Sequence, residues 1–98
     1  MIEVRQTGAF RRWLADMRDG IAVKAIKRRI ARVQAGLFGD AKSVGEGVFE
    51  LRVDHGPGYR VYFGRHGGSL VLLICGGDKD SQARDITRAK DMLKRWME

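Results

Sequence analysis

Hydrophobic residues recur every three or four positions in three stretches of the chain, which is the spacing of one buried face of an α-helix. Thr7 is suited to cap the first helix, Asp19-Gly20 separates it from the second, and Gly36 ends the second. Asp80 or Ser81 is the predicted N-cap of the third helix. The three apolar faces consist of Phe10, Trp13, Leu14 and Met17, of Ala22, Val23, Ile26, Ile30 and Val33, and of Ile86, Ala89, Leu93 and Trp96.

Shorter stretches show the pattern of β-strands. Apolar and polar residues alternate in 2–6, 48–54 and 59–63. A turn at Gly56-Pro57-Gly58 joins the last two of these and predicts a hairpin. Residues 70–75 are apolar throughout, which is typical of a central strand that is covered on both faces. Residues 36–47 contain four glycines and no periodic run, so we expect a loop there.

The predicted order of elements is β-α-α-β-β-β-α. It indicates an α+β fold, in which an N-terminal helical hairpin and a C-terminal helix pack on a small, mostly antiparallel sheet. The 98 residues, of which 44% are hydrophobic, predict a single domain over 1–98. Cys75 stands alone inside an apolar run, so we expect a buried thiol in a reducing compartment. No apolar stretch reaches the length of a signal peptide or a membrane span, and we therefore expect a cytoplasmic protein.

Most of the net charge of +7 lies in the first third of the chain, because residues 1–35 hold nine basic and three acidic side chains. Such a clustered excess is typical of a surface that binds a nucleic acid backbone or an acidic protein. A solvated helical face and a membrane-surface helix are alternative interpretations, but the apolar side of this helix pairs naturally with the preceding one. The second helix carries five basic residues, one of which is Arg29. The other four are the predicted RNA-binding residues of this helix: Lys24, Lys27, Arg28 and Arg32.

Two arginines occupy polar positions of the predicted hairpin. For the apolar residues of both strands to share one face, Arg52 must lie opposite Arg60 or two residues from that position. Close like charges destabilise a pair of strands unless Glu50 or Asp54 neutralises them, and they are tolerated best where an anion binds. Lys79 follows two glycines at the end of the last strand, where it would add a third cation and backbone amides would face the same anion.

Such a site fits a phosphodiester of RNA that is cleaved by its neighbouring 2′-hydroxyl, because that route needs a base, an acid and cations. Lys42, in the glycine-rich segment, is an outer member of the site. The two histidines lack further ligands at metal-binding spacing, so we expect no metal and no cofactor. Spacing singles out no residue for proton transfer, but Tyr62 shares the parity of Arg60 and is preferred to Tyr59, which is more typical of core packing. The other candidates are Lys79, Tyr59, His55 and His66, although both histidines are more typical of exposed turn residues.

Several motifs occur together along the chain. They are Phe10-x-x-Trp13-Leu14, Arg28-Arg29-Ile30, the segment from Gly39 to Val48, Glu50-Leu51-Arg52, Gly56-Pro57-Gly58-Tyr59-Arg60-Val61-Tyr62-Phe63, the segment from Leu72 to Gln82, Asp85-Ile86 and Ala89. With these motifs the chain resembles, over nearly its whole length, the HigB-like, phage-derived addiction-module killer proteins of the RelE/ParE toxin superfamily. The family's fold, a small sheet with a two-helix hairpin and a C-terminal helix, agrees with the predicted order of elements.

This resemblance implies the toxin of a bacterial type II toxin-antitoxin module, an endoribonuclease that cleaves mRNA, commonly on the translating ribosome. A cognate antitoxin, expected to be a helix-turn-helix protein, would hold it inactive. Arg52, Arg60 and Lys79 fall on the family's cationic positions. The chain departs from ribosome-dependent members in lacking a tyrosine or histidine near its C-terminus, which leaves the general base open. Some members of the superfamily poison DNA gyrase with the same fold, and a non-catalytic nucleic-acid-binding module is a third interpretation.

Overall fold

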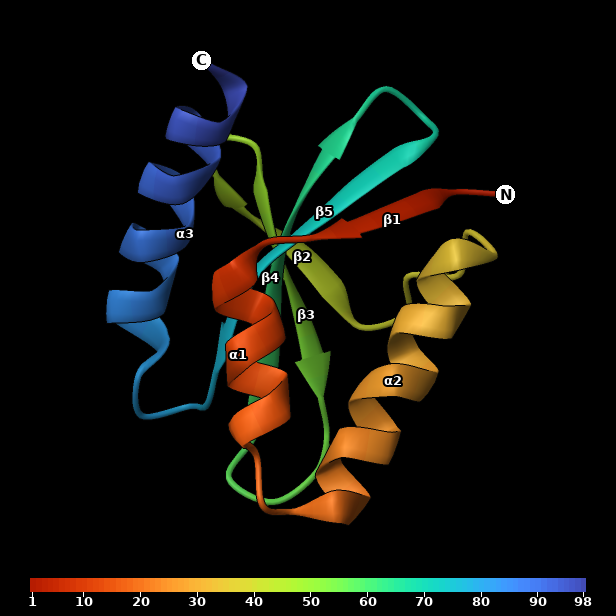
Figure 1. The fold of residues 1–98 in the computed structure, drawn as a ribbon, viewed down its shortest axis with the longest axis vertical. Coiled ribbons are helices and arrows are strands. Elements are labelled where there is room, and N and C mark those ends of the chain that lie inside the picture. The colour runs from red at the N-terminus through yellow and green to blue at the C-terminus, as the bar shows by residue number, and fades with distance from the viewer.

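Five strands form one mixed sheet in the order β1-β5-β4-β3-β2 in the computed structural model, which describes residues 1–98 (Figure 1). The strands β1 and β5 are parallel, and the other three neighbouring pairs are antiparallel. The elements are β1 (Glu3–Gln6), α1 (Gly8–Asp16), α2 (Gly20–Gln34), β2 (Ala41–Gly45), β3 (Val48–Val53), β4 (Tyr59–His66), β5 (Leu70–Gly77) and α3 (Gln82–Met97). The predicted α+β fold on a mostly antiparallel sheet is confirmed.

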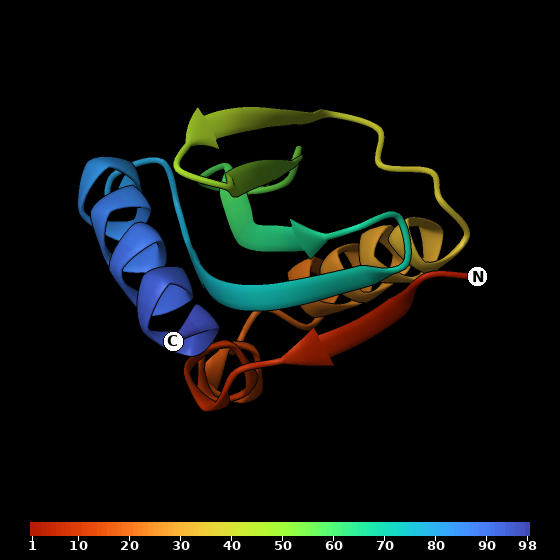
Figure 2. The same ribbon diagram turned by 90° about the horizontal axis from the view of Figure 1, so that it is seen from above.

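The helices cover opposite faces of the sheet, with α1 and α2 on one side and α3 on the other (Figures 1 and 2). Phe10 of α1 and Ile26 of α2 are fully buried in the cluster that contains Leu51 of β3. Ala89 of α3 belongs to a second cluster with Tyr62 of β4. The alternation along β3 and β4 therefore separates two apolar layers, and the face that carries the polar positions of the hairpin is partly covered by α3.

The segment predicted as a loop contains a strand, so this part of the prediction is wrong. β2 is an edge strand that pairs only with β3, and none of its five residues is fully buried. A strand with one partner and little burial shows no strong alternation of apolar and polar residues. The glycines of this segment therefore led to the prediction of a loop. Gly45, Glu46 and Gly47 all have positive φ angles and form the tight turn into β3.

β5 is the central strand that the apolar run predicted, because it lies between β1 and β4 and its residues 71–77 are buried. The register between β4 and β5 shifts at Tyr62 and Phe63, which pair with Cys75 and Leu73. Cys75 is buried as expected, and burial raises the pKa of its thiol to about 11. No helix of the chain combines the length and apolar character needed to cross a membrane.

Caps and close packing fix the helices next to the sheet. Thr7 Oγ1 accepts a hydrogen bond of 3.0 Å from Phe10 N, and Asp19 Oδ1 accepts one of 3.0 Å from Ala22 N. Ser81 precedes α3 at the N-cap position, although its hydroxyl makes no capping bond. The ring of Trp13 lies so close to Gly76 that a Cβ atom at this position would overlap it. Helix α1 therefore packs directly on the backbone of β5.

Candidate active site

Arg52 and Arg60 lie directly opposite each other on β3 and β4, as the alternation of the two strands predicted. The turn that joins the strands contains Gly56 and Gly58, both with positive φ angles, and so allows this register. Residues that lie opposite each other in an antiparallel pair project from the same face of the sheet. The two guanidinium groups are therefore neighbours on the face that α3 covers in part.

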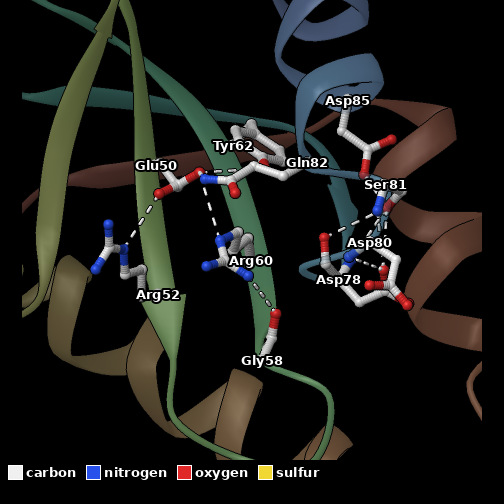
Figure 3. Close-up of polar contacts among 10 residues, drawn as sticks. All are labelled: Glu50, Arg52, Gly58, Arg60, Tyr62, Asp78, Asp80, Ser81, Gln82 and Asp85. Carbon is white, nitrogen blue, oxygen red and sulfur yellow. Dashed lines mark hydrogen bonds and ion pairs between the residues drawn. The ribbon is translucent and has the colours of Figure 1, made fainter.

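The fully buried carboxylate of Glu50 lies between the two arginines (Figure 3). Its Oε1 is 3.3 Å from Arg52 Nε, and its Oε2 is 3.6 Å from Arg60 Nε. The same carboxylate accepts hydrogen bonds from the Tyr62 hydroxyl, at 3.3 Å, and from Gln82 Nε2, at 2.8 Å. Of the two acids that were considered as a neutralising partner, Glu50 fills this role, whereas Asp54 is exposed and makes no ion pair.

The two arginine side chains differ in their exposure and in their contacts with the protein. The side chain of Arg60 is only 12% exposed and donates a hydrogen bond of 2.7 Å from Nη1 to the carbonyl of Gly58. Its Nε is buried and has no hydrogen-bond partner, since Glu50 is too distant for one. The side chain of Arg52 is 40% exposed. One carboxylate thus orients two guanidinium groups, and the cluster keeps one net positive charge.

A groove of about 250 Å³ runs beside the two arginines. Asp40, Asp54 and Tyr59 also line it, and neither carboxylate makes a side-chain hydrogen bond or ion pair. A carboxylate next to guanidinium groups in an open groove is a candidate general base. Neither acid stood out in the sequence as a candidate base, because Asp40 lies at the edge of the glycine-rich segment and Asp54 at the end of a strand.

Tyr62 does not line this groove, and its position argues against the predicted role in proton transfer. Its side chain is fully buried and donates its hydroxyl proton to Glu50. Burial first, and then the negative charge of Glu50, raise the pKa of Tyr62 well above its usual value. A buried phenol that stays protonated cannot accept a proton from a substrate. Tyr62 therefore supports Glu50 rather than contacting a ligand.

Lys79 lies near Arg60, as predicted, at the corner where β5 ends. A Cβ atom at Gly58 would lie 3.7 Å from Lys79 Cβ and 3.3 Å from Arg60 Nη1. Lys79 is exposed and makes no ion pair. Lys42 pairs with Glu50 in the register of β2 and β3, so it projects from the same face at the outer edge of the sheet. The structure thus brings the three predicted cations to one corner and places Lys42 beside them.

The basic residues of α2 are not part of this cluster, because α2 packs on the other face of the sheet. The side chains concerned are Lys24, Lys27, Arg28 and Arg32, all of them exposed. Arg29 differs from them, since it donates hydrogen bonds to the carbonyls of Arg52 and Phe38. It ties α2 to β3 and to the segment before β2. Sequence periodicity counted Arg29 with the basic surface and missed this structural role.

Neither histidine lines the groove beside the arginine pair. His55 Nε2 is 3.2 Å from Asp19 Oδ2 and joins the hairpin turn to the start of α2. His66 ends β4 at the opposite end of that strand from Arg60. No three side chains of His, Cys, Asp or Glu gather in a geometry that could hold a metal ion.

A larger pocket of about 610 Å³ adjoins the groove and was not predicted. It lies where β5 ends, between α1 and the start of α3, and Tyr59 lines both hollows. Its walls include Trp13, Arg84 and Arg88. Only the folded chain brings these residues together, since they come from helices at opposite ends of the sequence.

Comparisons with known proteins identify a relative of similar length. No family model matches the chain. An uncharacterized protein of Haemophilus influenzae is 49% identical over 89 residues, which cover 91% of this chain and 90% of the relative. Identity at this level over nearly all of both chains indicates a shared fold.

Proposed function

We propose that this chain, which belongs to the same family as the Haemophilus influenzae protein, is the toxin of a type II toxin-antitoxin module and cleaves mRNA. The proposal includes a RelE/ParE-like fold, to which the sequence motifs and the mixed sheet with helices on both faces are similar. The observation that carries it is the pair Arg52 and Arg60, held side by side by a buried carboxylate and left with a net positive charge.

The cluster suits a phosphodiester for geometric reasons. Guanidinium groups are planar and bind phosphate oxygens with two parallel hydrogen bonds, and both are held on rigid strands. Lys79 adds an exposed point charge at the same corner. A phosphodiester that is attacked gains a second negative charge on its non-bridging oxygens, so preorganised cations stabilise the transition state more than the ground state.

The reaction in this proposal is attack by the 2′-hydroxyl of RNA on its neighbouring phosphorus. A base takes the proton of the 2′-hydroxyl, the 2′-oxygen forms a bond to phosphorus, and the bond from phosphorus to the 5′-oxygen breaks. The leaving 5′-oxygen receives a proton, so the products are a 2′,3′-cyclic phosphate and a 5′-hydroxyl. Asp40 and Asp54 are the carboxylates that share the groove with the arginines and are the first candidates for the base.

The partners in this proposal are mRNA on the ribosome and a cognate antitoxin. The basic face of α2 lies across the sheet from the arginine pair, so it would bind a polyanion other than the scissile phosphate. Ribosomal RNA is such a polyanion, and contacts of this kind depend steeply on salt.

RNA sequencing of cut ends after induction of the wild type and of Arg60→Ala tests the function. We expect new 5′ ends in mRNA for the wild type and none for the variant, with Lys94→Ala, an exposed change on α3, as the matched control. Protein that has been treated with EDTA and then dialysed should cut RNA in a translating extract as well as untreated protein does. Intact mRNA together with gyrase-DNA adducts would instead support a gyrase poison, and RNA binding without turnover would support a binding module.

A further inference from the structure

The pocket at the end of β5 exists because β1 stops early. β1 pairs with β5 only as far as Leu73, and Thr7 then bonds to the carbonyls of Leu73 and Ile74. Beyond Ile74 no strand covers this edge of β5, and α1 and α3 flank it instead. The hollow of about 610 Å³ is therefore built by the topology, at the end of the strand next to the one that carries Arg60.

The pocket adjoins the groove of the candidate active site, and Tyr59 lines both. Gly77, in its wall, pairs with Arg60 of β4, which in turn pairs with Arg52 of β3. These three residues form one row across neighbouring strands, which lie about 4.8 Å apart. A phosphate at the two arginines is thus one strand away from the pocket, so the next nucleotide of the same RNA strand would reach it.

The lining offers hydrogen-bond donors that have no partner in the protein. Arg84 and Arg88 lie one turn apart on α3, are exposed, and make no ion pair or side-chain hydrogen bond. The indole N–H of Trp13 and the hydroxyl of Tyr59 are also unpaired, and the two rings pack edge to face with centroids 6.4 Å apart. Aromatic rings next to free arginines are the usual means of holding a base and its phosphate.

Three aspartates, Asp78, Asp80 and Asp85, also line the pocket, so that with the two arginines its lining carries one net negative charge. Asp78 Oδ1 accepts hydrogen bonds from Asp80 N and Ser81 N, and Asp85 Oδ2 accepts one from the Ser81 hydroxyl (Figure 3). Two of the three carboxylates are therefore engaged, Asp78 in the turn before α3 and Asp85 in the first turn of α3, while both arginines remain free. Any carboxylate oxygen that is left exposed is an acceptor for the amino group of a base.

We infer that this pocket binds the nucleotide adjacent to the scissile phosphate, with its base against Trp13 and Tyr59 and its phosphate at Arg84 and Arg88. The inference rests on the proposed function, because it extends the same RNA strand from the arginine pair. It assigns to the substrate a second phosphate besides the scissile one, which the proposed reaction alone does not require. The direction in which the RNA strand lies on the protein depends on whether the pocket holds the nucleotide on the 5′ or on the 3′ side of the scissile phosphate.

Tryptophan fluorescence gives a direct test. The variant Trp96→Phe leaves Trp13 as the only tryptophan, and Trp96 is an exposed residue at the far end of α3. A hexanucleotide of 2′-O-methyl RNA is the probe, because it lacks the attacking hydroxyl and is not cut. We expect saturable quenching of Trp13. In the same background, Arg84→Ala with Arg88→Ala should weaken binding by about tenfold and lower the salt slope by about 0.7 for each phosphate that is no longer bound.

The matched control is Lys94→Ala with Arg95→Ala, which removes the same charge from the same helix outside the pocket. Equal binding by the two double variants, or Trp13 emission that does not change on binding, would overturn the inference. If mRNA in a translating extract is still cut in an Arg60-dependent manner in that case, only the inference fails. If no RNA is bound or cut, the proposed function fails with it. Quenching by a polyglutamate peptide but not by RNA would assign the pocket to an acidic protein partner and overturn the inference.

Discussion

Gln82, the first residue of α3, donates a hydrogen bond of 2.8 Å to the buried carboxylate of Glu50 on β3. This bond links the C-terminal helix to the arginine pair, because the same carboxylate is the partner of Arg52 and Arg60. The position of α3 and the orientation of the two guanidinium groups are therefore coupled. A substitution of one residue of this network should therefore alter the positions of the others.

Glu50→Gln should lower both activity and stability. The amide keeps the shape of the side chain but removes the only negative charge between two adjacent guanidinium groups. Removing one partner of a buried charge cluster costs about 3 kcal/mol of the free energy of unfolding. Urea denaturation measures this loss, and Gln82→Ala, which removes one neutral donor, should cost about 1 kcal/mol. Equal losses in the two variants would show that the charge of Glu50 is not what the fold depends on.

Arg60→Ala should reduce the rate of RNA cleavage by about 10²–10³, the usual effect of losing one preorganised group that stabilises charge in the transition state. Arg52→Ala should act in the same direction. Arg60→Lys should recover little, because an ammonium group cannot make the planar, paired contacts of a guanidinium. Cleavage of a labelled RNA under single-turnover conditions measures the effect, and circular dichroism confirms that each variant is folded. Full activity in either alanine variant would remove the arginine pair from the mechanism.

Tyr62→Phe separates a supporting role from a catalytic one. The ring stays in the core, and only the hydroxyl that donates to Glu50 is lost. We expect the free energy of unfolding to fall by about 1 kcal/mol, while the cleavage rate stays within a few fold of the wild type. A loss as large as that of Arg60→Ala would mean that the hydroxyl takes part in proton transfer after all.

The cross-strand position of Arg52 and Arg60 was predictable because it depends only on local rules. Alternation assigns each residue to a face, and the short turn between the strands fixes the register to within one pair. The central place of β5 was equally predictable, since a strand that is apolar on both faces needs cover on both. Both features depend on residues that are neighbours in sequence and not on how distant elements meet.

The sequence did not reveal features that depend on contacts between distant segments. Glu50 is buried because α3 covers it, and Gln82 lies 32 residues away along the chain. The basic residues of α2 lie away from the arginine pair because α2 packs on the other face of the sheet. Periodicity alone does not indicate on which face of a sheet a helix packs. The pocket beside Trp13 follows from the point at which β1 ends. Edge strand β2 was missed because its partner, rather than its composition, makes it a strand.

Gly76→Ala should destabilise the protein by about 2 kcal/mol, because a Cβ atom there would overlap the ring of Trp13 and force α1 away from β5. Gly68→Ala is the control, since its Cβ atom would meet nothing within 4 Å and the backbone there has no positive φ angle. Thermal denaturation of the two variants checks the difference. Similar melting temperatures would show that α1 can shift without cost.

Asp19→Asn should lower stability at neutral pH but not in strong acid. The backbone N–H of Ala22 and then His55 lower the pKa of Asp19 below its usual value of 3.8. Because the folded pKa lies below the unfolded one, the charged form stabilises the fold above pH 3.8, and this contribution is lost as the pH falls through the folded value. Asparagine keeps an oxygen for Ala22 N but has no charge to form an ion pair with His55.

Urea denaturation between about pH 2 and pH 6 measures the free energy of unfolding of Asp19→Asn and of the wild type. The difference between the two, which we call the gap, should close below pH 3.8, as the Asp19 carboxylate of the wild type becomes protonated. Asp16→Asn, which changes an exposed carboxylate without an ion pair, is the control and should show no such gap. A gap that stays constant down to the lowest pH would contradict the role of the Asp19 charge, because the wild type would then keep its advantage after losing that charge.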